Sequence, residues 1–283
     1  MRLYYFSCLL VFLTWVLLWI GGLVNPMGAS LACPDWYFVP TCNGELLPAM
    51  TGGVLFEHGH RLWASMVGLL TVILAVGIWV SKKTDKQTRI LAIIAVLGVA
   101  LQGTLGGVTV LLGLSAALST LHLVVAMGFF CLLIYLAIRL RDNSKPVGGE
   151  TGFFVAFVFT FVQILLGGLI RHVGAGMACG NDWLSCGPSF WPSWHLGQLH
   201  MLHRLIGYAL AVVIGWVCIK QFGKISWAIV PIVLVFCQIG LGLWTVGSLR
   251  SAHVVAMHTA VGALILGSLW VLYWRGSTKR LST

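Results

Sequence analysis

Four histidines at matched positions are the residues in this chain best suited to bind a metal. His60 and His203 are each followed by an arginine, and His122 and His258 are each preceded, 20 residues earlier, by a glutamine. Histidine within or at the edge of a transmembrane segment is rare and costly without a partner. Because these four recur in the two halves of one sequence, they indicate a functional role.

Two histidines at one depth on different helices of a four-helix bundle can ligate one iron from opposite faces. The pattern predicts two bis-histidine haem sites, His60 with His122 and His203 with His258. Copper, or iron without a porphyrin, is a second interpretation. Many glycines near the histidines favour a broad, flat ligand packed against backbone, although close packing of membrane helices uses the same residue.

The repeat breaks at Glu57, which lies three residues before His60 and so shares its face of a helix. The aligned position in the second half is His200. Because a carboxylate can move protons, we expect the first half to be the reactive site and the second to transfer electrons or be structural. The alternative is an N-terminal acid favoured by the helix dipole. His58 aligns with Met201 and is not counted as a ligand.

An arginine follows the first histidine of each half, Arg61 in one and Arg204 in the other. A guanidinium pairs well with carboxylates, so haem propionates are candidate partners for both. Extension of the side chain to the membrane surface explains them equally well.

The eight cysteines fall into two groups. Four lie within apolar segments, where small core residues are expected: Cys8, Cys131, Cys218 and Cys237. The others form two loop pairs, Cys33 with Cys42 and Cys179 with Cys186. A structural disulfide is favoured for the second pair, whereas for the first a structural and a redox-active disulfide are equally supported. The spacing makes zinc less favoured.

These residues need membrane helices to position them. The chain has 283 residues, of which 59% are hydrophobic and only 8% charged, as in membrane proteins. Segments of about 20 apolar residues can span a bilayer. Eight qualify: 4–24, 58–80, 90–112, 119–139, 152–171, 199–219, 226–247 and 254–274. We predict an all-α polytopic membrane protein whose eight transmembrane helices form two pseudo-symmetric four-helix bundles, residues 1–143 and 144–283.

The positive charge gives an orientation. Of the 17 basic residues, 13 fall at helix ends on one side, including Lys145, Lys279 and Arg280. The positive-inside rule makes this side, with both termini, cytoplasmic and places the histidines near the outer face. The same distribution argues against nucleic-acid binding and favours contact with anionic lipids of the bilayer. A signal peptide is a weaker reading of the first segment, because its apparent Ala-Cys cleavage site recurs in mid-chain.

Several motifs together resemble the haem A synthase family over nearly the whole chain. They are the Gly-Gly…Cys-Pro-Asp-Trp…Cys segment from Gly21 to Cys42, the Glu-His-Gly-His-Arg segment at 57–61, and the four histidines. The resemblance implies an oxidoreductase that converts a methyl group of haem O to the formyl group of haem A for terminal oxidase assembly. It also implies haem B iron on His203 and His258, haem O near His60 and His122, and Glu57 beside the reacting methyl.

The resemblance further implies a bacterial-type plasma membrane and delivery of haem O by a haem O synthase. The sequence leaves open the electron acceptor and whether the chain forms a homo-oligomer. Two other functions fit a duplicated haem-binding bundle. A di-haem b-type electron carrier between quinol and an outer acceptor would hold two permanent haems and would not need Glu57. A haem transporter or chaperone would leave the haem side groups unchanged.

Overall fold

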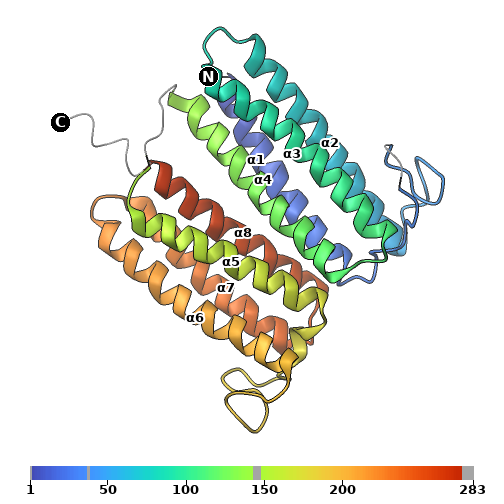
Figure 1. Cartoon of the computed structure of the whole chain (residues 1–283), viewed down its shortest axis with the longest axis vertical. Coiled ribbons are helices and arrows are strands. Elements are labelled where there is room, and N and C mark those ends of the chain that lie inside the picture. The colour runs from blue at the N-terminus through green and yellow to red at the C-terminus, as the bar shows by residue number, and fades with distance from the viewer. Residues whose placement is uncertain (1, 37–38, 143–147, 276–283) are drawn as a thin grey trace.

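The computed structural model describes residues 2–36, 39–142 and 148–275, and eight long helices dominate it (Figure 1). All eight are long and apolar enough to cross a membrane, which confirms an integral membrane protein. Their bounds are α1 Arg2–Val24, α2 Gly52–Val80, α3 Lys86–Leu111, α4 Ala116–Asp142, α5 Thr151–His172, α6 His195–Phe222, α7 Ile229–Gly247 and α8 Ala252–Arg275. Short 3-10 helices occupy Ala175–Met177 and Ser226–Ala228.

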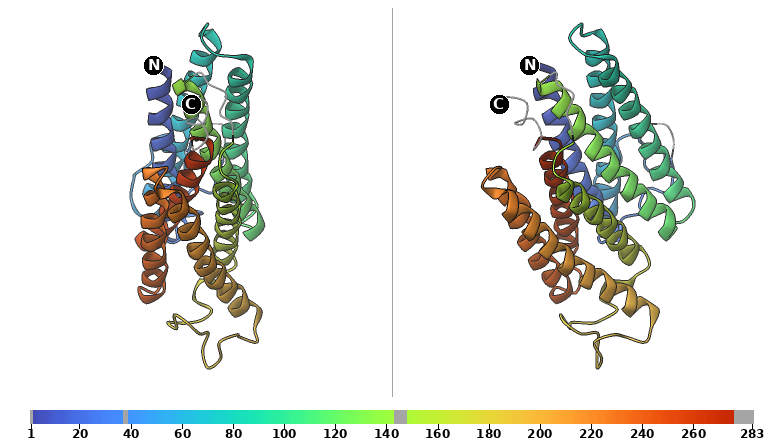
Figure 2. Two further views of the ribbon diagram at one scale, coloured as in Figure 1. Left: turned by 90° about the vertical axis from the view of Figure 1, so that its left-hand side faces the viewer. Right: turned by 60° about the vertical axis from the view of Figure 1, so that its left-hand side comes forward.

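Each half of the chain closes into a ring of four helices. In the first half, α1 packs on α2, α2 on α3, α3 on α4 and α4 on α1, and the same succession of contacts joins α5 to α8. The figures show the two sets side by side with their long axes inclined to each other (Figures 1 and 2). In each ring the second and fourth helices therefore occupy opposite corners. An exact pseudo-symmetry between the halves stays a prediction.

The two rings meet along α1, α4, α5 and α8. A buried cluster at this seam includes Leu18, Met127, Phe130 and Leu266. Two indole N–H groups also cross it, from Trp15 to the carbonyl of Ala260 at 3.0 Å and from Trp270 to that of Cys131 at 3.0 Å. In the most apolar stretch of α4 and of α8, 50% and 56% of the residues are buried, against 17–28% in the other helices. These two helices therefore form the centre of the molecule.

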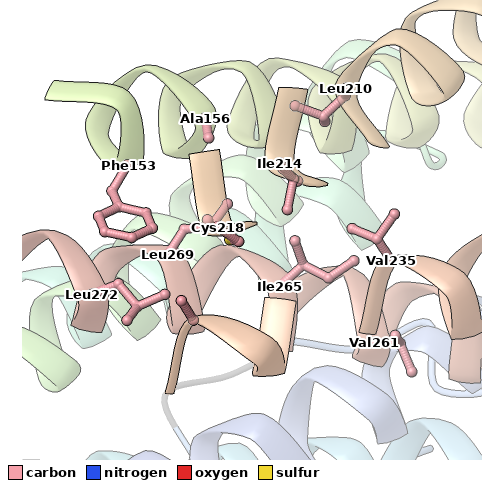
Figure 3. Close-up of a cluster of buried hydrophobic side chains, with 11 residues drawn as sticks. Phe153, Ala156, Leu210, Ile214, Cys218, Val235, Val261, Ile265, Leu269 and Leu272 are labelled. Atoms are coloured by element: carbon pink, nitrogen blue, oxygen red, sulfur yellow. The ribbon is translucent and has the colours of Figure 1, made fainter. Parts of the chain in front are cut away.

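Each ring also has its own apolar core. In the second half this core joins Phe153 of α5, Ile214 of α6, Val235 of α7 and Leu269 of α8 (Figure 3). At one end this core reaches the histidines, because Ile214 and Val235 also line the cavity that contains His203 and His258. Apolar side chains therefore fill the second ring up to the end that carries the histidines.

Several helices begin earlier than predicted, and two of these extensions bear on the histidine end. α2 begins at Gly52 rather than at 58, and α6 begins at His195 rather than at 199. The polar residues at these ends read as the edge of an apolar span, but the long loops cover them and allow the helices to continue. As a result Glu57 is the sixth residue of α2, beyond its first turn.

The opposite end of the helices carries most of the basic residues. There Asp85 caps α3 by accepting from the backbone N–H of Thr88 at 2.9 Å, and its other oxygen pairs with Arg139 of α4 at 2.7 Å. The hydrogen bonds from Thr88 and Arg139 lower the pKa of Asp85 to about 2. The predicted bundle boundary at 143/144 and the basic residues Lys145, Lys279 and Arg280 lie outside the described residues.

Candidate functional site

The four predicted ligand histidines lie on the even-numbered helices at one end of the molecule. His60 is on α2, His122 on α4, His203 on α6 and His258 on α8. Since the second and fourth helices of a ring stand at opposite corners, each pair faces across its ring. His203 and His258 also line one cavity, so the structure brings the second predicted pair together. Metal binding by either pair stays a prediction.

A glycine on the preceding helix makes room for each of these rings. A Cβ atom at that glycine would stand close to the Cε1 atom of the histidine, so a side chain there would displace the imidazole. The contacts, measured from that Cβ position to Cε1, are Gly21 with His60 at 2.9 Å, Gly106 with His122 at 3.4 Å, Gly167 with His203 at 3.0 Å, and Gly242 with His258 at 3.3 Å. The same arrangement occurs four times, so it is common to both halves of the chain.

The imidazoles have no protein partner that competes with a ligand. In His60, His122, His203 and His258 the Nδ1 atom is buried without a hydrogen-bond partner among the described residues. Buried polar atoms in folded proteins are nearly always paired, and an exception calls for an explanation such as a bound group. Four such exceptions at repeat-related positions fit the prediction that each pair binds one metal-centred ligand.

The second half encloses a cavity of about 250 Å³ between these residues. Both His203 and His258 line it, together with glycines that leave backbone exposed to its interior: Gly167, Gly168, Gly207, Gly242 and Gly262. A wall of histidine, glycine and aliphatic side chains suits a flat, largely apolar ligand. Gln163 fixes one side by donating from Nε2 to the carbonyl of His203 at 2.7 Å.

Glu57 in the first half is a buried carboxylate held by two groups. It is 4% exposed. Its Oε2 accepts from the backbone N–H of Cys33 at 2.9 Å, and its Oε1 pairs with Arg61 at 2.8 Å. The interpretation of Glu57 as an acid of the first helical turn is wrong, because α2 begins at Gly52 and its first turn contains no acidic residue.

Arg61 and Arg204 are used differently although they align. Arg61 donates to the carbonyls of Cys33, Asp35 and Thr41 as well as to Glu57, so its terminal nitrogens are occupied by the first loop. Arg204 has only carbonyl partners, in Asp182 and Ser185, and its Nη2 is buried without a partner among the described residues. A propionate role stays a prediction for both, and the geometry favours it for Arg204.

The outer cysteines form two disulfides, Cys33–Cys42 and Cys179–Cys186. Each stabilises a loop that folds over the start of α2 or α6. In the second loop the sulfurs pack on Met201, whereas the aligned residue of the first half is His58, which is fully buried with neither ring nitrogen paired among the described residues. Of the four remaining cysteines, Cys131 and Cys218 are buried, but Cys8 and Cys237 are exposed on helix surfaces, so the expectation of core positions for these two is wrong.

One loop tryptophan covers part of the first half. Trp36 lies against Gly107 of α3, so closely that a Cβ there would overlap the indole. Gly107 follows Gly106, which packs on His122. Trp183 in the second loop is 55% exposed and lines the cavity. Consecutive glycines at 106 and 107 were the available signal, because an indole can rest there directly on backbone.

Replacement of Gly167 by alanine tests the histidine pocket. The new Cβ would stand 3.0 Å from the His203 ring and force it to move, which overpacking data place at about 1–3 kcal/mol. We expect a lower melting temperature and an altered absorption spectrum of the purified protein. Gly215→Ala on α6 is the matched control, since its Cβ meets nothing within 4 Å. Equal behaviour of the two variants would contradict the pocket.

Removal of each disulfide separates a structural from a chemical role. Loss of either cross-link is expected to lower the free energy of unfolding by roughly 2–4 kcal/mol. The Cys179→Ser, Cys186→Ser variant should keep its turnover per folded protein. The Cys33→Ser, Cys42→Ser variant should lose turnover as well, because Cys33 holds Glu57 through its backbone N–H. Equal turnover in both folded variants would show that the first disulfide is only structural.

Comparison with known proteins now identifies relatives. A family model described as COX15-CtaA, cytochrome oxidase assembly protein, matches residues 4–270. The chain is similar to a protein named heme A synthase from Halalkalibacterium halodurans, at 26% identity over 90% of each chain. A protein of the same name from Exiguobacterium sibiricum is 25% identical over 99% of this chain and 97% of its own, and one from Listeria monocytogenes is 24% identical over 94% and 91%.

Proposed function

The chain belongs to the COX15-CtaA family of cytochrome oxidase assembly proteins and acts as an oxidoreductase in haem A synthesis, and we propose a division of that work between its two halves. Residues 144–283 hold haem B, with its iron between His203 and His258. Residues 1–143 receive haem O between His60 and His122. Glu57 then stands beside the methyl group that is oxidised to a formyl group.

The observation that carries this assignment is the difference between the halves at one aligned position. Both have the histidine pair, the glycine cradle and the loop disulfide, but only the first has a buried carboxylate, where the second has His200. A histidine pair alone suffices to hold an iron porphyrin. A buried carboxylate beside it adds the capacity to hold a proton or to stabilise positive charge, which oxidation of a methyl group requires.

The residues of the second half fit an iron porphyrin. Two imidazoles face each other across a cavity lined by glycines, and the buried Nη2 of Arg204 can donate to a propionate. A haem bound there supplies one-electron redox chemistry. The protein orients the two imidazoles through Gly167 and Gly242 and surrounds the site with apolar side chains that exclude water.

In the first half the protein positions a carboxylate. The Cys33 N–H donates to Oε2 of Glu57 and Arg61 donates to Oε1, so both oxygens are fixed. Glu57 therefore accepts a proton from the substrate side or stabilises positive charge that develops there. Trp36 on Gly107 covers the neighbouring part of the ring and shields it from water.

The membrane orientation follows from the charges. The end opposite the histidines carries most of the lysines and arginines and is placed in the cytoplasm with both termini. The haem sites and the two disulfide loops then lie near the outer face, where disulfides persist. Haem O reaches the first half within the bilayer, delivered by a haem O synthase.

Analysis of the bound haems tests the function. The protein is purified from cells that make haem O, and its extracted haems are identified by chromatography and mass. We expect one haem B per chain together with haem O, haem A or a hydroxylated intermediate. Two haem B per chain and no other haem would support the di-haem electron carrier instead. Haem O that is bound but never altered would support a transporter.

A further inference from the structure

Three arginines line the cavity of the second half beside His203 and His258: Arg171, Arg204 and Arg250. With Arg61 they are the only basic residues of the chain outside the group of 13 at the other end. None of the three has a carboxylate within 4.0 Å among the described residues. Buried or partly buried cations are normally paired, so this set lacks a directly bonded counter-charge, although the Asp182 carboxylate acts on Arg204 from beyond that distance.

The hydrogen bonds of these arginines leave donors free. Arg171 donates from Nη2 to the carbonyl of Gly22 at 3.0 Å and lies near Asn25, and Nη2 of Arg204 is buried without a described partner. No side-chain hydrogen bond of Arg250 occurs among the described residues, and its guanidinium passes beside Gly176. Arg171 and Arg250 also repel each other electrostatically, which raises the cost of leaving the set uncompensated.

The first half has no such set. Position 171 aligns with Asn25 and position 250 with Leu114, and Arg61, which aligns with Arg204, is neutralised by Glu57. The turns that carry Leu114 and Arg250 have the same backbone shape, with φ of 63° and 66° at these residues. The backbone conformation is therefore repeated in both halves, but the positive charge is present only in the second. We conclude that these arginines serve a function of the second half alone.

We infer that Arg171, Arg204 and Arg250 form a binding site for a ligand with two carboxylates, the propionates of the haem held by His203 and His258. The inference rests on the proposed function. It assigns three arginines to the resident haem. The substrate haem has only Arg61 near its site, and that arginine is already paired with Glu57. Haem B is then retained through its carboxylates, whereas haem O, held by histidines and apolar contacts, can enter and its product can leave.

An anionic lipid headgroup presents similar chemistry, but the geometry favours the porphyrin. The three arginines line the same cavity as both histidines. A flat ligand fixed by both imidazoles has its carboxylates at one edge, and the two anionic groups match more than one cation. A lipid phosphate would have to leave the bilayer surface to reach this wall.

The test measures retention of haem rather than activity. Haem is extracted from the purified protein, which is then reloaded with haem B or with its dimethyl ester, and transfer to excess apomyoglobin is followed by absorbance. Arg250→Gln is the main variant, because no described hydrogen bond of the fold depends on that side chain. Arg89→Gln at the opposite end removes the same charge and serves as the control. Each sample is examined in bilayer discs of phosphatidylcholine and of phosphatidylglycerol.

We expect Arg250→Gln to lose haem B about 10- to 100-fold faster than the wild type, the effect of one charge-assisted hydrogen bond. The wild type should release the dimethyl ester about as fast as Arg250→Gln releases haem B. Arg250→Gln should release haem B and the ester at nearly the same rate, and both results should hold in either lipid. Equal rates of haem B release by wild type and Arg250→Gln would overturn the inference. It would also be overturned if the substitution accelerated release of the ester as much as that of haem B, or acted only in phosphatidylglycerol. A wild type that binds no haem would overturn the proposed function itself.

Discussion

Replacement of His203 by alanine is expected to remove the resident haem from an otherwise folded protein. The imidazole is one of two protein ligands proposed for the iron. His200, also on α6, lines the same cavity but aligns with Glu57 rather than with a histidine of the first half. Loss of one ligand should lower the haem B retained on purification more than about 10-fold, since even changes around a metal ligand cost 10- to 100-fold. Haem content per protein and the low-spin absorption spectrum measure the effect, and His258→Ala should behave in the same way.

His195→Ala is the matched control for this prediction. His195 begins the same helix, but it is exposed. It should keep the haem content and spectrum of the wild type, which separates loss of a ligand from general damage to the start of α6. A His203→Ala protein with an unchanged low-spin spectrum would show that this residue is not a ligand.

The sequence was sufficient to predict the helices and the places of the histidines on them, because both depend on patterns local to one segment. A span of about 20 apolar residues can satisfy its backbone in a bilayer only as a helix. Repetition then supplied the pairing, since His60 and His203 take the same place in their halves, as do His122 and His258. The glycines that face these rings recur too, so their spacing was visible although their contacts were not.

The use of Arg61 and Glu57 could not be predicted, because it depends on how a loop folds back. Nothing local to the Glu-His-Gly-His-Arg segment shows that Cys33 donates to the carboxylate or that three loop carbonyls take up the guanidinium. The cluster of Arg171, Arg204 and Arg250 was hidden for the same reason, since its members come from the end of α5, the first half of α6 and the turn between α7 and α8. Exposure of Cys8 and Cys237 depends on which side of a uniformly apolar helix meets a neighbour.

Replacement of Glu57 by glutamine is expected to stop haem A formation while leaving haem B in place. Glutamine has nearly the same size, and its carbonyl can still accept from the Cys33 N–H. It cannot hold a proton or carry the negative charge that stabilises developing positive charge. General acid–base groups contribute about 10²- to 10⁴-fold to rate, and product per haem B should fall by that factor. Haem A and any hydroxylated intermediate are measured by chromatography and mass.

Glutamine is a sharper test than alanine at this position. Alanine would leave the Cys33 N–H unpaired and the Arg61 guanidinium partly buried without its anion, which can cost about 3–5 kcal/mol and unfold the loop. Glu45→Gln, an exposed glutamate of the same loop, is the matched control and should keep full activity. Undiminished product from Glu57→Gln would leave Glu57 with only the structural task of holding the first loop to α2. A rate that falls only in the Glu57 variant, with haem B content unchanged in both, would place the reaction in the half that carries the carboxylate.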